Sequence, residues 1–271
     1  MTSAPASPAR WPADRGDGPS EVPRSDGVPL PRRWLLHGGR PASRWLIRRR
    51  FSVRLHHPER VPRRGGVVLA ANHVGWADGP LLAIFSPRPA HALTKVEMFT
   101  GPLGAFLRTC GQVPLDRFRP DPAAIRTCLG LLRAGRVVGV FPEGRRGPGD
   151  LSRFHRGPAY LALVTGAPVV PVVILGTREP GGRSGDLPRR GAHVDLYYGE
   201  PLRLPRQPWP RTREQVEEAS LLLRRYMLTT LDAARAATGR DLPGPLPPDD
   251  LEEDPYAGLV LLDPGSPPGA P

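Results

Sequence analysis

The residues of this sequence best suited to acid–base chemistry are a histidine and an aspartate five positions apart. His73 directly follows an apolar run over 67–71, which predicts a buried strand, and Asp78 precedes a stretch over 79–86 that predicts a helix. A strand end is a rigid mount, and the short loop between the two residues can fold the carboxylate back onto the imidazole. An aspartate that fixes the tautomer of a histidine and stabilises its charged form makes the pair a competent general base. For this spacing alone, a histidine that only caps a loop is the alternative.

Three further segments follow in order and strengthen this interpretation. Residues 111–117 open with a glycine and end with Arg117. Residues 137–146 are an apolar run that breaks into a Pro-Glu-Gly turn followed by two arginines. Residues 167–174 are an apolar run punctuated by prolines. Four segments in a fixed order are more specific than one histidine–aspartate spacing.

Together, the four segments resemble the glycerolipid acyltransferase family, which includes the 1-acylglycerol-3-phosphate acyltransferases. The resemblance covers roughly residues 53–200. It implies an enzyme that moves a fatty acyl group from an acyl thioester, either acyl-CoA or acyl-carrier protein, to the free hydroxyl of a lysophospholipid. The first expected acceptor is 1-acylglycerol-3-phosphate, which would give phosphatidic acid. Neither a cofactor nor a metal is expected, since the acyl donor is itself a substrate.

In the implied reaction, His73 is the general base that takes a proton from the acceptor hydroxyl, and Asp78 orients it. An acyl-enzyme is not expected, because the chain has no G-x-S-x-G turn and neither cysteine lies in a recognised catalytic context. The acyl group would therefore pass directly from donor to acceptor in a ternary complex.

The resemblance also implies residues that bind the acceptor. Arg117 is the expected phosphate ligand, since the planar guanidinium can bind two phosphate oxygens; a plain surface arginine is the alternative. Glu143, in the Pro-Glu-Gly turn, is expected to orient Arg146 or the acceptor, with a purely structural turn as the alternative. The predicted substrate-binding residues are Asn72, Gly75, Arg117, Glu143, Gly144 and Arg146. Secondary candidates are Lys95, His155 and Arg156.

At three positions the sequence departs from the family pattern. Gly75 replaces the common serine, Arg145 a threonine, and Gly147 a second serine. These changes leave the His73–Asp78 pair intact but alter the hydrogen-bond donors around the acceptor. A glycolipid or another alcohol is therefore an alternative acceptor.

Charge is distributed unevenly along the chain. The 271 residues carry a formal net charge of +12, yet residues 241–271 contain seven acids and no lysine or arginine, so residues 1–240 carry +19. A basic body attracts anionic partners such as lipid headgroups, the phosphates of CoA or an acidic carrier protein. The two cysteines have no ligand-type spacing and suit a reducing compartment without a disulfide. No apolar stretch reaches the roughly 18 residues that a membrane span needs.

A basic lead-in precedes the first motif. Residues 32–64 contain eleven arginines and one acid, Glu59, interleaved with the aromatic residues Trp34 and Trp45. Arginines with tryptophan and leucine anchors are typical of a segment that lies on anionic lipid. We therefore expect a cytoplasmic protein, peripheral on the inner face of the cell membrane. The alternative is a solvated lead-in that packs onto the domain, and nucleic acid is not expected because no recognised binding motif accompanies the charge.

The elements that would position these residues alternate between strands and helices. Asp121 and Pro122 form a good helix start, as N-cap and first helical residue. Because the strands read as continuous apolar runs, we predict an α/β fold: a single domain with a mostly buried mixed sheet covered by helices. Strands are expected near 52–56, 67–71, 90–94, 137–141, 169–175 and 193–198, and helices near 79–86, 101–109, 122–134, 158–165 and 213–237.

Composition suggests four parts. Residues 1–31 are rich in proline, serine and glycine without periodicity or a signal-peptide pattern, and a disordered tail is predicted. A membrane-surface lead-in over 32–52, the acyltransferase domain over 53–240 and a disordered acidic, proline-rich tail over 241–271 follow.

Two further functions compete with the acyltransferase interpretation. A relative that binds anionic lipid without turnover is one, although the intact His73–Asp78 pair disfavours it. A metal-dependent hydrolase with these two residues as ligands is the other, and no further set with ligand spacing supports it.

Overall fold

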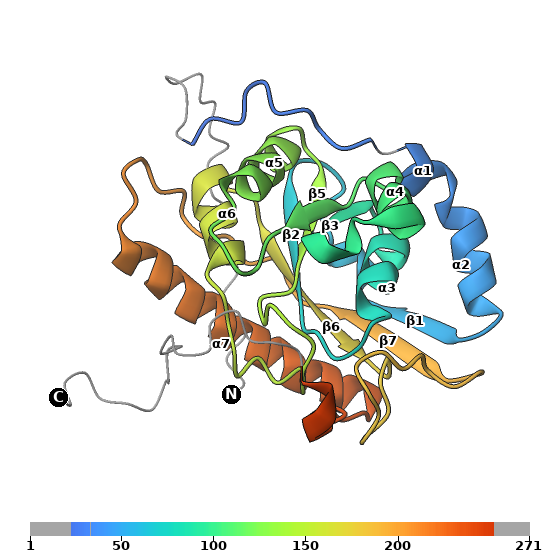
Figure 1. Ribbon diagram of the computed structural model, residues 1–271. Coiled ribbons are helices and arrows are strands. Elements are labelled where there is room, and N and C mark those ends of the chain that lie inside the picture. The colour runs from blue at the N-terminus through green and yellow to red at the C-terminus, as the bar shows by residue number, and fades with distance from the viewer. Residues whose placement is uncertain (1–22, 33, 252–271) are drawn as a thin grey trace, which may run out of the picture.

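A twisted seven-stranded sheet forms the centre of the molecule, with helices on both faces (Figure 1). The structure is a computed structural model that describes residues 23–32 and 34–251. The strands lie in the order β1-β7-β6-β2-β5-β3-β4. Their bounds are β1 Ser52–His56, β2 Val67–Ala71, β3 Ala90–Lys95, β4 Val113–Leu115, β5 Val137–Val140, β6 Val169–Leu175 and β7 His193–Tyr198.

Strand direction determines which chain ends meet. All neighbouring strands are parallel except β6 and β7, which are antiparallel. The predicted mixed sheet is therefore confirmed. Strand β2 pairs with β5 on one side and with β6 on the other, both in parallel. The carboxyl ends of β2, β5 and β6 consequently lie at the same edge of the sheet.

Both faces of β2 are buried, which explains its unbroken apolar sequence. Val68 and Ala70 belong to a core built with helices α5 and α6, whereas Val67, Leu69 and Ala71 belong to a second core that includes α3. Successive side chains of a strand point to opposite faces, so a strand covered on both sides must be apolar at every position.

Seven α-helices and three short 3-10 helices occupy the described part of the chain. Their bounds are α1 Trp34–Gly38, α2 Arg40–Arg48, α3 Asp78–Phe85, α4 Gly101–Thr109, α5 Pro122–Arg133, α6 Gly157–Thr165, α7 Arg213–Thr238, η1 Pro58–Arg60, η2 Val96–Met98 and η3 Pro248–Asp250. The predicted cap of α5 is confirmed: the side chain of Asp121 accepts the N–H of Ala124 at 2.9 Å, and Pro122 is the first helical residue. None of these helices is long and apolar enough to cross a bilayer.

The edge strand β4 was not expected from the sequence. It has only three residues, too few to show a pattern, and contains Pro114, which lacks an N–H for a sheet ladder. An edge position tolerates such a proline because one side of the strand has no partner.

The packed chain extends beyond the boundaries predicted at residues 31 and 240. Arg133 donates to the carbonyl of Pro23 and to Ser25, and Leu30 packs against the core. After α7, the chain returns to the sheet edge, where the carbonyl of Gly244 accepts a hydrogen bond from Arg178. The predicted disorder of residues 1–22 and 252–271 lies outside the described residues.

Candidate active site

The site lies where β2, β5 and β6 end, towards the lower centre of Figure 1. Asn72 is the first residue after β2 and is 1% exposed. Its side chain accepts the N–H of Ile174 at 2.7 Å and donates to the carbonyl of the same residue at 3.1 Å. The Asn72 amide thus continues the pairing of β2 with β6 past the strand end and anchors the loop that follows.

The predicted contact between His73 and Asp78 is present. Nδ1 of His73 donates to Oδ2 of Asp78 at 2.9 Å, and Asp78 is fully buried at the first position of α3. The same oxygen accepts the backbone N–H groups of Val74 at 2.7 Å and Gly75 at 2.8 Å. The hydroxyl of Thr177 donates to the other oxygen at 2.5 Å. Four donors and the amino end of a helix compensate this buried carboxylate.

The imidazole of His73 is held on its face as well as at its edge. It stacks on Phe141 with the ring centroids 4.2 Å apart and the planes at 23°. Because Nδ1 faces Asp78, Nε2 is the nitrogen that can accept a proton. The side chain keeps 20% of its surface exposed, so a substrate hydroxyl can approach.

Glu143 contacts the backbone of the histidine loop. Its Oε1 accepts the N–H of His73 at 2.9 Å, and the N–H of Gly149 also donates to the carboxyl group. Burial raises the pKa of Glu143 to about 8, and the charges of Asp150 and Asp78 act in the same direction, against these two donors. The carboxyl group is therefore largely protonated near neutral pH, and it connects the turn after β5 to the loop after β2.

A second bond joins the same two loops. The N–H of Gly147 donates to the carbonyl of His73 at 2.9 Å. His73 is therefore tied to the turn after β5 through both its N–H and its carbonyl.

Arg117 joins this cluster from the loop after β4. It donates to the carbonyl of Gly144 at 3.1 Å. Gly144 has a φ of +70°, and a Cβ there would lie 2.5 Å from Nε2 of His155, so glycine is required both for its backbone and for the space. The structure thus brings Arg117, Gly144 and His155 together beside Glu143.

Arg146 and Arg156 contact partners outside this cluster. Arg146 donates to the carbonyl of Ser184 at 3.1 Å, in the loop after β6. Arg156 forms an ion pair with Glu217 of α7 at 3.0 Å. Lys95 is the last residue of β3.

Gly75 acts through its backbone N–H, which Asp78 accepts. A Cβ at this position would lie 3.3 Å from the carbonyl oxygen of Thr177 and 3.6 Å from Cβ of Arg178. Any side chain at position 75 would therefore press against the segment that follows β6.

The sequence interpretation missed Thr177 and Arg178. They are 0% and 3% exposed, directly beyond the end of β6. Polar residues just after a strand that runs parallel to β2 must lie at the same edge as His73, so the β2–β6 pairing is the signal that would have pointed to them.

No group of three or more histidine, cysteine, aspartate or glutamate side chains that could hold a metal occurs in the residues that the structure describes. The site is thus built from one histidine–aspartate pair, a buried glutamate and several arginines.

Comparisons with known proteins agree on one type of enzyme. A family model described as Acyltransferase matches residues 52–175. The chain is 33% identical, over 58% of its own length and 77% of the relative's, to a 1-acyl-sn-glycerol-3-phosphate acyltransferase of Bacillus subtilis. It is 32% identical to the human 1-acyl-sn-glycerol-3-phosphate acyltransferase beta, over 51% of this chain and 55% of that protein. The crystal structure of the 1-acyl-sn-glycerophosphate acyltransferase PlsC from Thermotoga maritima has a TM-score of 0.54 and 24% identity, covering 76% of this chain and 79% of that one, and shows a similar fold.

Proposed function

The chain belongs to the glycerolipid acyltransferase family and is an acyltransferase, and we propose that it acylates the free hydroxyl of 1-acylglycerol-3-phosphate to give phosphatidic acid. The acyl donor in this proposal is a thioester, acyl-CoA or acyl-carrier protein. The observation that carries the proposal is the 2.9 Å bond between His73 and Asp78, at the edge where three parallel strands end. The names of the bacterial and human relatives support the choice of acceptor.

The proposed reaction is a direct transfer. Nε2 of His73 takes the proton of the acceptor hydroxyl as its oxygen attacks the thioester carbonyl carbon. The tetrahedral intermediate then collapses, the C–S bond breaks, and the departing thiolate takes the proton from the imidazolium. Asp78 keeps Nδ1 as the protonated nitrogen and stabilises the positive charge on the ring.

Arginines around the Glu143 turn are the proposed ligands of the acceptor phosphate. Arg117 lies against Gly144, one residue beyond Glu143, whose carboxyl group in turn contacts the backbone of His73. Arg146 follows two residues later in the same turn. A planar guanidinium can bind two phosphate oxygens through parallel N–H bonds, which suits these arginines to a phosphate.

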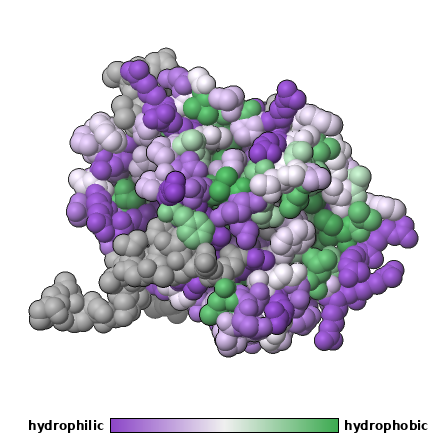
Figure 2. Space-filling view, viewed as in Figure 1, coloured by the Kyte–Doolittle hydropathy of each residue, from purple (hydrophilic) through white to green (hydrophobic). Residues whose placement is uncertain are grey.

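We propose that α1 and α2 bind an anionic lipid surface. Trp34, Trp45 and Leu46 are 63%, 61% and 65% exposed. Figure 2 shows hydrophobic surface next to strongly hydrophilic side chains on the side where Figure 1 places α1, α2 and α4. Exposed tryptophan and leucine beside arginine is the composition of an interfacial helix, and we propose that the protein works in the cytoplasm on the inner membrane face.

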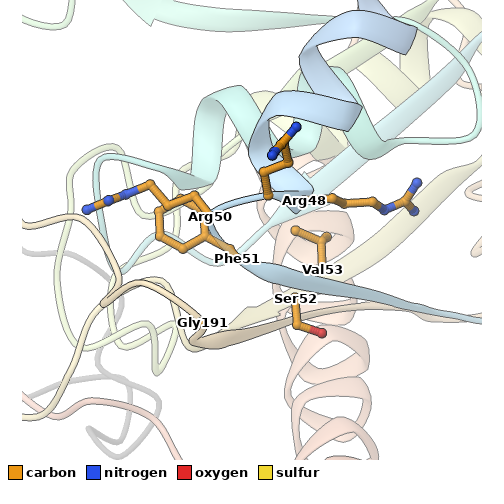
Figure 3. Close-up of a pocket in the computed structure, with 7 residues that line it drawn as sticks. Arg48, Arg50, Phe51, Ser52, Val53 and Gly191 are labelled. Carbon is orange, nitrogen blue, oxygen red and sulfur yellow. The ribbon is translucent and has the colours of Figure 1, made fainter.

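An open basic pocket at the end of α2 supports this orientation. It encloses about 330 Å³ and is lined by Arg48, Arg49, Arg50, Phe51, Ser52, Val53 and Gly191. In Figure 3 the arginine side chains spread from the chain in different directions around the pocket. Such a spread suits several lipid headgroups at once rather than one enclosed phosphate.

The proposed function is tested by acyl transfer to lysophosphatidate in vesicles, with acyl-CoA and acyl-carrier protein as alternative donors. Replacing His73→Ala should lower kcat by roughly 10² to 10⁴, the range expected for a lost general base. His57→Asn is the matched control, since His57 lies at the opposite edge of the sheet, before η1, and asparagine tolerates its φ of 56°. Transfer that persists in His73→Ala would contradict the mechanism.

A glycolipid or another alcohol is the second candidate acceptor, because Gly75 and Arg145 change the hydrogen-bond donors at positions where the family commonly has serine and threonine. Transfer to a glycolipid that exceeds transfer to lysophosphatidate, and that is insensitive to Arg117→Ala, would favour it. Transfer that requires both the phosphate and Arg117 would favour the first proposal.

A further inference from the structure

Two buried residues that have no role in the mechanism above contact Asp78 and the loop of His73. Thr177 and Arg178 follow β6, whose partner β2 leads into His73. The bonds between Asn72 and Ile174 fix the two strand ends against each other, so the residues just beyond them face the histidine loop.

Arg178 donates hydrogen bonds to backbone carbonyls from separate loops. Its Nε donates to Val74 at 2.8 Å, in the histidine loop, and a terminal nitrogen donates to Gly147 at 3.0 Å, in the turn after β5. Further bonds reach Gly182 at 3.1 Å and Gly244 at 2.5 Å. A guanidinium is a rigid fork, so carbonyls bound to it keep a fixed spacing.

The electrostatics of Arg178 suit a buried organiser. Burial lowers the pKa of its guanidinium, and the charge of Asp78 opposes this effect. The charges of Asp250 and Asp186 act in the same direction as that of Asp78, so nearby carboxylates stabilise this cation while its hydrogen bonds go to neutral carbonyls.

Thr177 acts on Asp78 directly. Its hydroxyl donates to Oδ1 at 2.5 Å, while Oδ2 faces Nδ1 of His73. With one oxygen held by Thr177, the carboxylate cannot rotate away from the imidazole without losing a bond.

We propose that Thr177 and Arg178 are positioning residues of the acyl transfer: Thr177 fixes the carboxylate that orients His73, and Arg178 fixes the loop of His73 against the turn of Glu143. This inference rests on the proposed function, because a position matters only for a step in which His73 Nε2 meets the acceptor hydroxyl. Reacting groups displaced by about 1 Å can lose about 10²-fold in rate.

Arg88 provides a matched control for Arg178. It is also an arginine whose pKa is lowered by burial, and it donates to the carbonyls of Pro62, Gly65 and Gly135 at 2.9, 2.8 and 2.5 Å. Those carbonyls precede β2 and β5, at the opposite edge of the sheet from His73. Arg178→Lys and Arg88→Lys therefore remove the same kind of bonding at the two edges.

The test compares kcat, KM for lysophosphatidate and the thermal midpoint of these two variants. We expect Arg178→Lys to lower kcat by about 10²-fold with little change in KM, and Arg88→Lys to lower the midpoint without a comparable loss of kcat. Equal losses of kcat in both variants, or wild-type kcat in Arg178→Lys, would overturn the role of Arg178.

The role of Thr177 is tested by an isosteric pair. Thr177→Val removes the hydroxyl at nearly constant volume, and Thr177→Ser keeps it. We expect kcat to fall about tenfold or more in the valine variant and to recover in the serine variant. Equal kcat in the two variants would overturn the role of Thr177, and this test does not depend on whether Arg178→Lys folds.

A spectroscopic signal separates this inference from the proposed function. The Nδ1 proton of His73, assigned by its loss in His73→Ala, reports the bond to Asp78 in proton NMR whether or not the substrate is correct. We expect its resonance to shift or broaden in Arg178→Lys and Thr177→Val but not in Arg88→Lys. An unchanged resonance in both site variants would refute the positioning role, whereas a wild-type protein inactive on lysophosphatidate would refute only the acceptor.

Discussion

Arginine is buried and hydrogen-bonded at the carboxyl edge of the sheet but exposed at the end of α2. At the sheet edge, Arg178 is 3% exposed and donates to carbonyls of several loops. At the end of α2, Arg49 and Arg50 are exposed, and their guanidinium groups lie 4.8 and 5.4 Å from the ring centroids of Trp45 and Phe51. Within the described part of the chain, neither of these two side chains forms an ion pair. The first arginine organises the fold, and the others remain available to an anionic surface.

Arginines of α2 also differ among themselves in whether they contact the rest of the fold. Arg40 and Arg44, one turn apart, both donate to the carbonyls of Ile84 and Ser86 at the carboxyl end of α3. A helix end offers unpaired carbonyls and a partial negative charge, which favours cations there. Burial, together with the charge of Arg44, opposes this effect and lowers the pKa of Arg40 to about 10. The number of arginines in the lead-in therefore overstates the charge available to the proposed membrane contact.

The strongest test of the sheet edge is its central carboxylate. Asp78→Asn should lower kcat by about 10³-fold or more, because a carboxamide cannot accept all of the donors around Asp78 and favours the wrong histidine tautomer. Transfer kinetics under saturating donor would measure the loss. Asp232→Asn, at a side chain 76% exposed on α7, serves as the control and should leave kcat unchanged.

A small loss in Asp78→Asn, similar to that of the control, would show that the edge is less rigid than its hydrogen bonds indicate. The contrast between a rigid sheet edge and an adaptable α2 would then fail, since both regions would tolerate a change of charge.

The pH dependence of stability tests the buried carboxyl group of the same edge. The folded pKa of Glu143, about 8, lies above its ordinary value of 4.5, so its protonation stabilises the fold fully below pH 4.5. This stabilisation is lost as pH rises through about 8. Wild type should therefore lose on the order of a few kcal/mol relative to Glu143→Gln between pH 5 and pH 9, since glutamine stays neutral. Denaturant unfolding of both proteins across that range measures the difference, and parallel curves would contradict the raised pKa.

The sequence predicts the sheet edge better than the contacts that hold it. A buried strand over 67–71 and a helix near 79–86 follow from local patterns, and the structure has β2 at Val67–Ala71 and α3 at Asp78–Phe85. Thr177 and Arg178 contact residues 99 and 104 positions away, and no local pattern encodes such partners. The strand direction that places them beside His73 becomes evident only once β6 is paired with β2.

In the lead-in, composition predicts the type of segment but not which arginines contact the fold. Its composition predicts an interfacial segment, but the faces of α2 depend on where the helix begins and ends. Once Arg40–Arg48 is known to be helical, the four-residue spacing places Arg40 and Arg44 on the α3 side. Trp45 and Arg49, also four apart, lie on another side and contact each other. Composition alone treats all of these arginines as equivalent.

A matched pair of substitutions on α2 gives the smallest expected effect and the sharpest comparison. Arg44→Ala removes the hydrogen bonds to the carbonyls at the end of α3 and should destabilise the fold by about 1–2 kcal/mol. Denaturant unfolding measures this loss, and vesicle binding should change little. Arg49→Ala removes one cation near the surface and should weaken binding to anionic vesicles about fivefold, with little effect on stability. Because both substitutions remove the same charge, one from α2 and one from its C-cap, any difference between them reports position. If Arg44→Ala weakened vesicle binding as much as Arg49→Ala, charge rather than position would govern the contact with lipid, and the two faces of α2 would not have separate roles.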